Sequence, residues 1–392
     1  MGQLFKQLGI LSAALLMTSG VFAQDTDLRI RRTGNLDPSL PKPVSIKGFP
    51  GEIASILAFD LEVAGCVIRP ENEADHRVSG KFAGGKLEGY LNDAAGKNLL
   101  AKIYQGASTR ILVHAFANEI ILKVTGTPGI ASTRFAFKNR TRGQGEIYIA
   151  DYDGHGVIQA TRDNTIVAAP AWGLQNRYLF YTSYKLGNPD IFSHDLSSGK
   201  RVPLVRISGA NLTPVPSPSG RKLAMVLSKS GSPNLYVADM NGQNLRRLTY
   251  VKEGVMTPTW SPDSQWLCYV SRQAGPARLY KIRASGGDDV RVATVGANPA
   301  TEPDWSPDGS TIAFTTQSRG GFTLCIVPAA GGTATHLVNG EDPSWARNSR
   351  TIMFVKRRAD QSYYLSLLDV PTKTVKDVPL RLGNASQPAW AR

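Results

Sequence analysis

A chain of 392 residues with 42% hydrophobic and 19% charged residues has room for one large repeat domain and a smaller one, and it excludes a largely disordered protein. The formal net charge is +14, and nearly all of the excess lies in residues 131–392, which favours a solvated basic surface or a face for an acidic partner. The three cysteines form no CxxC pair and no zinc-ligand spacing. We expect buried free thiols at Cys66, Cys268 and Cys325, with a Cys268–Cys325 bridge as the alternative.

The first 23 residues have the three parts of a secretory signal peptide. Lys6 gives the positive start, residues 8–17 form a short apolar run, and Val-Phe-Ala at residues 21–23 fits a cleavage site. The apolar run is too short to cross a bilayer. We therefore expect a mature chain that starts at Gln24 and is exported to the periplasm, a location that argues against a nucleic-acid partner.

Residues 24–130 predict a small α/β domain. A helix over residues 51–64 carries apolar side chains at i, i+3, i+4 and i+8, which places them on one face: these are Ile53, Ile56, Leu57 and Leu61. A second helix begins at Ser108 or Thr109 and runs to about Val124. Its expected buried side chains are Ile111, Ala115, Ile120 and Leu122. Short strands are expected at residues 44–46, 77–82, 86–92 and 99–104, and no strand–turn–helix unit has the glycine-rich loop that a nucleotide site needs.

The remaining residues contain an internal repeat. A Pro-x-aromatic signature, often followed by a Ser-Pro-Asp turn, returns six times at intervals of 40 to 45 residues. This period, filled with short strands, is typical of a β-propeller with one blade per repeat. The copies start at Pro170, Pro214, Pro258, Pro303, Pro343 and Pro388, and the second copy has Pro216 in the aromatic position.

The residues between the signatures also fit a propeller. The middle strands of each repeat are apolar on both faces, as expected for blades packed between two neighbours. Turns at Asn241-Gly242, Gly286-Gly287 and Gly331-Gly332 supply residues that adopt positive φ in tight hairpins.

The signature itself has a structural explanation. Ser-Pro-Asp-Gly suits a type I turn in which the aspartate side chain bonds nearby backbone. The aromatic side chain before the turn is large enough to fill the space between adjacent blades. We therefore expect core positions at Trp172, Trp260, Trp305, Trp345 and Trp390.

The two ends of the repeat region complement each other. The signature at Pro388 has no blade after it, whereas strands within residues 134–165 have no signature before them. Pairing the last strand with this first group closes the ring and leaves no free sheet edge. The predicted fold is a small N-terminal α/β domain, residues 24–130, followed by an all-β six-bladed β-propeller, residues 131–392.

The whole mature chain resembles the TolB family, periplasmic propeller proteins of the Tol–Pal system of Gram-negative bacteria. The resemblance rests on the order of signal peptide, α/β domain and PxWSPDG repeats. It also rests on three segments outside the generic repeat: residues 109–126 leading into IASTRFAFKN, the turn Asp-Tyr-Asp-Gly at 151–154, and SKSGSPNLYVADMNG at 228–242.

This resemblance implies a non-enzymatic, monomeric scaffold for envelope integrity and cell division. It would bind TolA through the mature N-terminal segment, with Asp27, Leu28, Arg29, Ile30 and Arg31. It would bind the peptidoglycan-associated lipoprotein Pal through one propeller mouth, lined by the loops before the signatures, with Asn211, Thr213, Met256, Thr257, Thr301, Glu302 and Asp342. The alternatives are a terminus without a partner and loop positions with no role in binding.

An enzyme is the alternative class, a metal-dependent lyase or a hydrolase acting on a periplasmic glycan. A peptidase is not expected, because the chain has no GxSxG elbow and no α/β-hydrolase domain. Lyase chemistry needs several histidines or carboxylates that converge on the channel, whereas surface or core positions are expected for His76, His114, His155, His194 and His336. We expect no cofactor, and a Ca²⁺ held in the channel by carbonyls and aspartates remains open.

Overall fold

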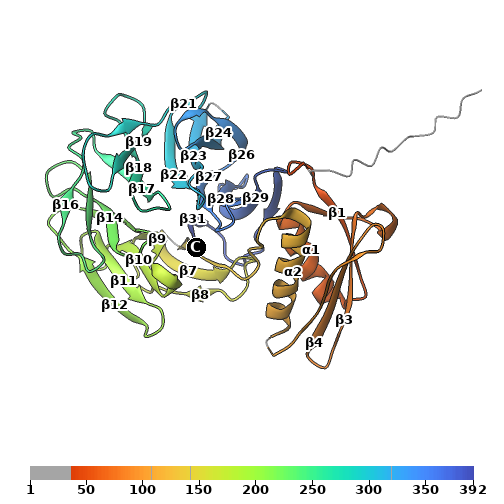
Figure 1. The fold of residues 1–392 in the computed structure, drawn as a ribbon. Helices are drawn as coiled ribbons and strands as arrows, with labels where there is room; N and C mark the ends of the chain where they lie inside the picture. The colour runs from red at the N-terminus through yellow and green to blue at the C-terminus, as the bar shows by residue number, and fades with distance from the viewer. Residues whose placement is uncertain (1–36, 107, 142, 319) are drawn as a thin grey trace, which may run out of the picture. The chain divides into compact units, whose positions relative to one another are not determined.

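The computed structural model describes residues 37–392 except 107, 142 and 319 (Figure 1). The expected signal peptide and the segment Asp27–Arg31 lie outside the described residues. Residues 38–392 form one compact unit. This unit contains a small α/β region and then a six-bladed β-propeller, so the predicted fold class is confirmed. The domain boundary at residue 130 stays a prediction.

The α/β region is a five-stranded sheet with two helices on one face (Figure 1). The strand order is β2-β1-β3-β4-β5, in which β1 is parallel to β2 and β3 and the other pairs are antiparallel. The elements are β1 (Lys42–Lys47), α1 (Gly51–Val63), β2 (Cys66–Ile68), a short 3-10 helix (Glu71–Glu73), β3 (His76–Ala83), β4 (Lys86–Asp93), β5 (Asn98–Tyr104) and α2 (Thr109–Thr125).

The buried face of α1 was predicted correctly, and that of α2 only in part. Ile53, Ile56, Leu57 and Leu61 of α1 are all buried. In α2, Ile120 is buried and Ala115 is partly buried, but Ile111 is 58% exposed and Leu122 is 47% exposed. The helix instead buries Leu112, Val113, Phe116, Ala117, Ile120, Ile121 and Val124. Because α2 is apolar on nearly every side, its periodicity does not identify the side that packs against α1 and the sheet.

Six four-stranded sheets, here called blades A to F in ring order, make up the propeller. Blade A contains β31 (Ala385–Trp390), β6 (Arg134–Thr141), β7 (Gln144–Asp151) and β8 (Ile158–Gln159). Blade B contains β9 (Val167–Trp172), β10 (Tyr178–Ser183), β11 (Asp190–Asp195) and β12 (Lys200–Val205), with a 3-10 turn at Leu174–Asn176. Blade C contains β13 (Asn211–Pro216), β14 (Lys222–Leu227), β15 (Asn234–Asp239) and β16 (Arg246–Arg247).

The second half of the ring repeats this order. Blade D contains β17 (Val255–Trp260), β18 (Trp266–Ser271), β19 (Arg278–Arg283) and β20 (Val290–Arg291). Blade E contains β22 (Ala300–Trp305), β23 (Thr311–Ser318), β24 (Gly321–Pro328) and β26 (Thr335–Asn339). Blade F contains β27 (Glu341–Trp345), β28 (Thr351–Arg357), β29 (Tyr363–Asp369) and β30 (Thr374–Asp377). A parallel pair, β21 (Thr294–Val295) and β25 (Gly332–Thr333), joins blades D and E.

The ring closes as the sequence predicted. The last strand, β31, pairs with β6 in antiparallel register, so Trp390 lies opposite Phe135 and Ala389 opposite Ala136. Blade A therefore contains strands from both ends of the repeat region, and its inner edge is paired.

The interior of the ring is apolar on both faces of the blades. Five consecutive residues are buried in both β14 and β18. Cys66, Cys268 and Cys325 are buried free thiols, as predicted, and burial raises the pKa of Cys66 and of Cys268 to about 12.

The signature turns have the predicted geometry. The carbonyl of Ser261 accepts a hydrogen bond from the N–H of Ser264 at 2.9 Å, and Asp263 accepts from the N–H of Gln265 at 2.9 Å. Four of the five tryptophans of the signature are buried, namely Trp260, Trp305, Trp345 and Trp390, whereas Trp172 is partly exposed. Within the described part of the chain, no helix is long and apolar enough to span a bilayer.

Candidate partner-binding mouth

The inner strands of all six blades share a backbone irregularity at the same position. The residue before each signature proline has a left-handed conformation, with φ between 43° and 56°, although none of the six is glycine: Ala169, Thr213, Thr257, Glu302, Asp342 and Gln387. At each of these positions the register with the second strand of the blade shifts, which defines a β-bulge. A non-glycine residue in this conformation costs roughly 1–3 kcal/mol, so six of them require support from their surroundings.

Hydrogen bonds between neighbouring blades supply part of that support. Glu302 Oε2 accepts from the N–H of Asp342 at 3.0 Å, and Asp342 Oδ2 accepts from the N–H of Gln387 at 3.2 Å. Gln387 Oε1 then accepts from the N–H of Ala169 at 3.0 Å. The N–H of Thr213 donates instead to Thr182 Oγ1 at 3.1 Å. Side chains at the bulges of blades E, F and A thus each accept a hydrogen bond from the backbone N–H at the bulge of the next blade. We call the six bulge residues the bulge ring.

Burial changes the titration of the two acids in the bulge ring. It raises the pKa of Glu302 and, together with the repulsion of Glu302, raises the pKa of Asp342 to about 8. The neighbouring Glu341 is paired with Arg357 at 2.9 Å. Burial and mutual repulsion thus both raise the pKa values of the Glu302–Asp342 pair, which favours a proton shared between the two adjacent carboxyl groups.

Four of the predicted mouth residues belong to the bulge ring, and they lie where the inner strands begin. They are Thr213, Thr257, Glu302 and Asp342. The hydroxyls of Thr213 and Thr257 are buried and have no hydrogen-bond partner among the described residues.

The other three predicted residues have different surroundings. Met256 is 43% exposed and available to a partner. Thr301 is partly buried, and its hydroxyl donates to the Thr315 carbonyl at 3.3 Å. Asn211 is only 1% exposed, and its amide donates to the Ile207 carbonyl at 2.8 Å, so this residue holds the loop and presents no surface.

Sequence reasoning missed three features of this mouth. Ala169 and Gln387 complete the bulge ring. The sequence could have indicated them, because each is the residue directly before a signature proline. Tyr250 is 75% exposed in the loop before β17, with the Arg247 guanidinium 4.5 Å from its ring centre. Tyr250 and Met256 therefore give the mouth an exposed aromatic and an exposed thioether side chain, which are common in protein-binding surfaces.

The opposite end of the channel has a different construction. A cavity of about 400 Å³ opens there among the signature residues, and Arg392 lies at its rim. The Arg392 guanidinium donates to the carbonyls of Trp345 at 3.1 Å and Trp305 at 3.2 Å, and it is paired with Asp304. Arg392 therefore links the end of β31 in blade A to blades F and E.

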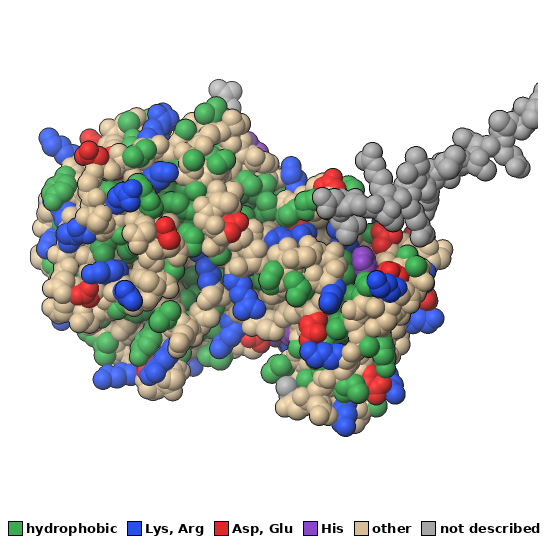
Figure 2. Space-filling view, viewed as in Figure 1, with side chains coloured by type: hydrophobic (Ala, Val, Ile, Leu, Met, Phe, Trp, Pro, Cys, Tyr) green, Lys and Arg blue, Asp and Glu red, His purple; other side chains and the backbone are tan. Residues whose placement is uncertain are grey.

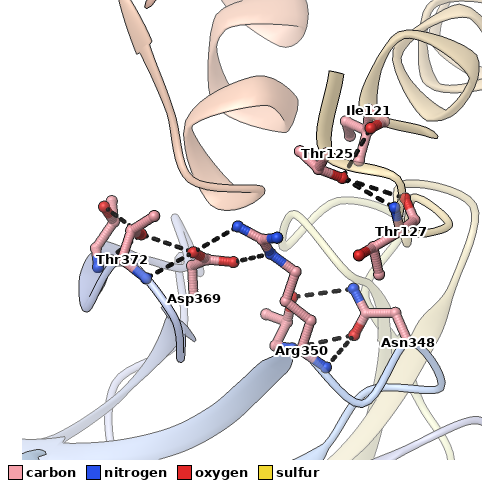
Figure 3. Close-up of polar contacts among 9 residues, drawn as sticks. Ile121, Thr125, Thr127, Asn348, Arg350, Asp369 and Thr372 are labelled. Carbon is pink, nitrogen blue, oxygen red and sulfur yellow. Dashed lines mark hydrogen bonds and ion pairs between the residues drawn. The ribbon is translucent and has the colours of Figure 1, made fainter. Parts of the chain in front are cut away.

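Two buried charge clusters lie where the α/β region meets the propeller. In the first, Arg350 Nε lies 2.5 Å from Asp369 Oδ1, and the Thr372 hydroxyl donates to Asp369 Oδ2 at 2.6 Å (Figure 3). Gly65, which follows α1 with φ 80°, packs so closely on this cluster that a Cβ there would lie 2.6 Å from Asp369 Oδ2. Glycine at this position is therefore required both by the backbone conformation and by the approach of blade F.

The second cluster is centred on His114 of α2. Its Nδ1 lies 2.8 Å from Asp60 Oδ2 of α1, and its Nε2 lies 3.1 Å from Asp153 Oδ2 in the loop after β7, without the angle of a hydrogen bond. Tyr152 donates to Asp60, and Arg110 is paired with Asp153. Burial disfavours the imidazolium, but the two carboxylates outweigh it and raise the pKa of His114 to about 9.

Among the described residues, no three or more His, Cys, Asp or Glu side chains are grouped so that they could hold a metal ion. Calcium in the channel stays a prediction. Figure 2 shows Lys and Arg side chains in small groups scattered over the visible face, among uncharged side chains.

The geometry defines the class as a six-bladed β-propeller that follows a small α/β region and has a bulged inner rim at one mouth. The chain belongs to the family described as the TolB beta propeller domain, whose profile matches residues 121–392.

Curated relatives agree with this family, and a solved structure has the same fold. The Tol-Pal system protein TolB of Desulfosudis oleivorans is 34% identical over 132 residues, which are 33% of this chain and 30% of that protein. The Tol-Pal system protein TolB of Alcanivorax borkumensis is 28% identical over 258 residues, which are 56% of this chain and 59% of that protein. The chain thus matches about a third to three-fifths of their length. The crystal structure of TolB from Acinetobacter baumannii has the same fold, with a TM-score of 0.81 at 22% identity over 91% of this chain and 98% of that chain.

Proposed function

We propose that this protein is a non-enzymatic scaffold of the Tol–Pal system in the periplasm, and that it binds the lipoprotein Pal at the mouth formed by the bulge ring and its preceding loops. Membership of the TolB propeller family supports the Tol–Pal assignment. The observation that carries the docking site is the bulge ring, because strained positions repeated in every blade mark a rim whose shape is held in advance for a partner.

The mouth combines the features that a protein partner needs. Tyr250 is exposed in the loop before β17 and Met256 is exposed in β17 itself. The side chains of Glu302 and Asp342 are held by hydrogen bonds from backbone amides of the next blades. Aromatic and thioether side chains contribute much of the energy in protein interfaces, whereas buried polar groups fix the geometry. Thr213, Thr257 and Thr301 complete the proposed rim.

Calorimetric titration of the full chain with the soluble domain of Pal from the same organism tests this proposal. We expect saturable one-to-one binding that weakens by at least about tenfold in the double variant Tyr250→Ala/Met256→Ala, since hot-spot truncations cost about 2 kcal/mol or more. Tyr90→Ala is the matched control, because Tyr90 is 40% exposed on β4 of the α/β region. Absence of binding by a correctly folded protein, or equal losses in both variants, contradicts Pal docking at this mouth.

We further propose that Asp27–Arg31 bind TolA. The basis is the resemblance of the mature N-terminal segment to that of the family, and the segment lies outside the described residues. Deleting residues 27–31 should abolish binding of soluble TolA while the affinity for Pal remains within about twofold of the parent chain. TolA binding that survives the deletion contradicts this assignment and leaves the Pal proposal untouched.

A further inference from the structure

A second cavity lies between blades A and B, at the end of the ring opposite the bulge ring. It has a volume of about 490 Å³, which is within the range of small-molecule sites. The strand register shows this position. Arg134 is the first residue of β6 and lies beside the C-terminal end of β31. His194 of β11 pairs with Leu179 of β10, and Leu179 pairs with Trp172 at the C-terminal end of β9. Nothing in the proposed Pal or TolA interactions uses this cavity, and we call it the A–B cavity.

The wall of the A–B cavity carries positive charge. Three arginines line it, Arg134, Arg162 and Arg201, and no acidic residue does so among the described residues. Arg134 lies 3.8 Å from Asp151 and is 49% exposed at its side chain, so this pair is weak. Arg162 is exposed and makes no ion pair in the part of the chain that the structure describes.

The third arginine is held in place by a buried carboxylate. Arg201 Nη1 donates to Asp163 Oδ1 at 2.8 Å, and the Asp163 side chain is only 1% exposed. Lys185 lies 3.4 Å from the same Asp163 oxygen, so two cations share one carboxylate. The Asp163 anion therefore fixes the Arg201 side chain without cancelling the positive charge around the cavity.

A buried histidine gives the cavity an unused polar group. His194 is 7% exposed, lines the cavity, and has an Nδ1 atom with no hydrogen-bond partner among the described residues. Burial and the nearby Arg201 charge lower the pKa of His194, which keeps the imidazole neutral at neutral pH. A buried polar atom without a partner is costly in a folded protein, and a ligand would satisfy it.

The rest of the wall is aliphatic. Ile149, Ile158 and Leu196 line the cavity, and Ile158 is 55% exposed at its edge. We propose that the A–B cavity binds a small anion, a carboxylate or a phosphate monoester, that carries a short aliphatic segment. Arg134, Arg162 and Arg201 bind the anionic group, the neutral His194 contributes a hydrogen bond, and Ile158 and Leu196 cover the aliphatic segment.

Titration of the full chain with hexanoate and with hexyl phosphate tests the ligand class. The head group that binds more tightly shows whether the ligand is a carboxylate or a phosphate monoester. We expect saturable binding of at least one of these anions, at least about tenfold tighter than acetate, which lacks the tail, or hexylamine, which has the opposite charge. Binding should weaken when salt is raised from about 0.05 M to about 0.5 M. Failure of both hexyl anions to bind, or equal binding of hexylamine, overturns the proposal.

Two double variants, each of which removes two positive charges, test whether the anion binds in the A–B cavity. Arg134→Gln/Arg162→Gln should weaken binding by about tenfold or more, because charged hydrogen bonds to the anion are lost. Arg221→Gln/Arg272→Gln removes two exposed arginines from blades C and D and should leave the affinity within about twofold. Ile158→Ser should weaken hexanoate and leave acetate unchanged. Equal affinities in the two arginine double variants would falsify the assignment to the A–B cavity.

Discussion

Arg350 and Asp369 form a buried ion pair in blade F, against which Gly65 of the α/β region packs closely. Both side chains are buried, at 8% and 0% exposure, and Asp369 also accepts hydrogen bonds from Thr372. Nearby, Lys376 of β30 is paired with Glu62 of α1 at 2.6 Å, but this pair is more exposed. A buried ion pair is costly to break, because the remaining charge loses its partner without regaining water.

We predict that Arg350→Met destabilises the protein by about 3–5 kcal/mol, since it leaves the Asp369 carboxylate buried and unpaired. The double variant Arg350→Met/Asp369→Leu should recover much of this loss. Arg177→Met is the control, because the Arg177–Asp195 pair is exposed and its loss should cost far less than the loss of Arg350. Urea unfolding followed by circular dichroism measures all three, and an Arg350→Met cost as small as that of the control contradicts the prediction.

At the scale of elements, His114 joins α1, α2 and the loop after β7. The charged and titratable groups around it are Asp60 of α1, Arg110 of α2, and Tyr152, Asp153 and His155 of the loop. Burial opposes the Asp153 anion, but His114 and Arg110 outweigh it and lower the pKa of Asp153 to about 2. Burial raises the pKa of Asp60 despite its contact with His114.

This cluster predicts a particular pH dependence of stability. The pKa of His114 is raised from about 6.5 to about 9, so its contribution is complete below pH 6.5 and is lost as pH rises through 9. The difference in unfolding free energy between the parent protein and His114→Gln should therefore shrink by roughly 3 kcal/mol from about pH 6 to about pH 9.5. Urea unfolding at a series of pH values measures this difference, and a difference that does not change with pH shows that the fold does not raise the pKa of His114.

The elements also show what sequence periodicity can and cannot reveal. The repeated signature predicted the blades, their turns and the closure by β31, because each depends on local residues that recur. The bulge ring was not predicted, since Thr257 or Glu302 has no intrinsic preference for positive φ, and the conformation depends on neighbouring blades. The His114 cluster was also missed, because Asp60, His114 and Asp153 are distant in sequence and converge only in the fold.

Four of the seven predicted mouth residues are in the bulge ring because the repeat fixes where each inner strand begins. Asn211 illustrates the limit of this reasoning. Its position before the signature suggested exposure, but its amide satisfies carbonyls of its own loop and it is buried. The contribution of each mouth residue to binding stays a prediction until Pal affinity is measured.

At the scale of the whole molecule, closure of the ring depends on the last strand. β31 supplies the inner edge of blade A, Trp390 is 3% exposed with its Nε1 donating to Thr133 Oγ1 at 2.9 Å, and Arg392 reaches blades E and F. β31 is the last strand in the chain, yet it pairs with β6, the first strand of the repeat region, while Arg392 just after it bonds blades E and F. Its removal exposes the edge of β6 and leaves buried groups of three blades without partners.

We predict that the full chain unfolds cooperatively on heating and that deletion of residues 385–392 abolishes this cooperativity and leads to aggregation, because the edge of β6 is open and the contacts of Trp390 are lost. Arg392→Gln is the milder companion variant, and it should cost about 1–3 kcal/mol by leaving the partly buried Asp304 without its cation. A synthetic peptide of residues 383–392, added in trans, should restore cooperative unfolding by pairing with β6 as an added strand. If the truncated chain instead melts cooperatively close to the temperature of the full chain, the blades are stable through contacts with their neighbours alone. Rescue by the peptide would show that the strand pairing itself, and not the covalent continuity of the chain, holds the ring closed.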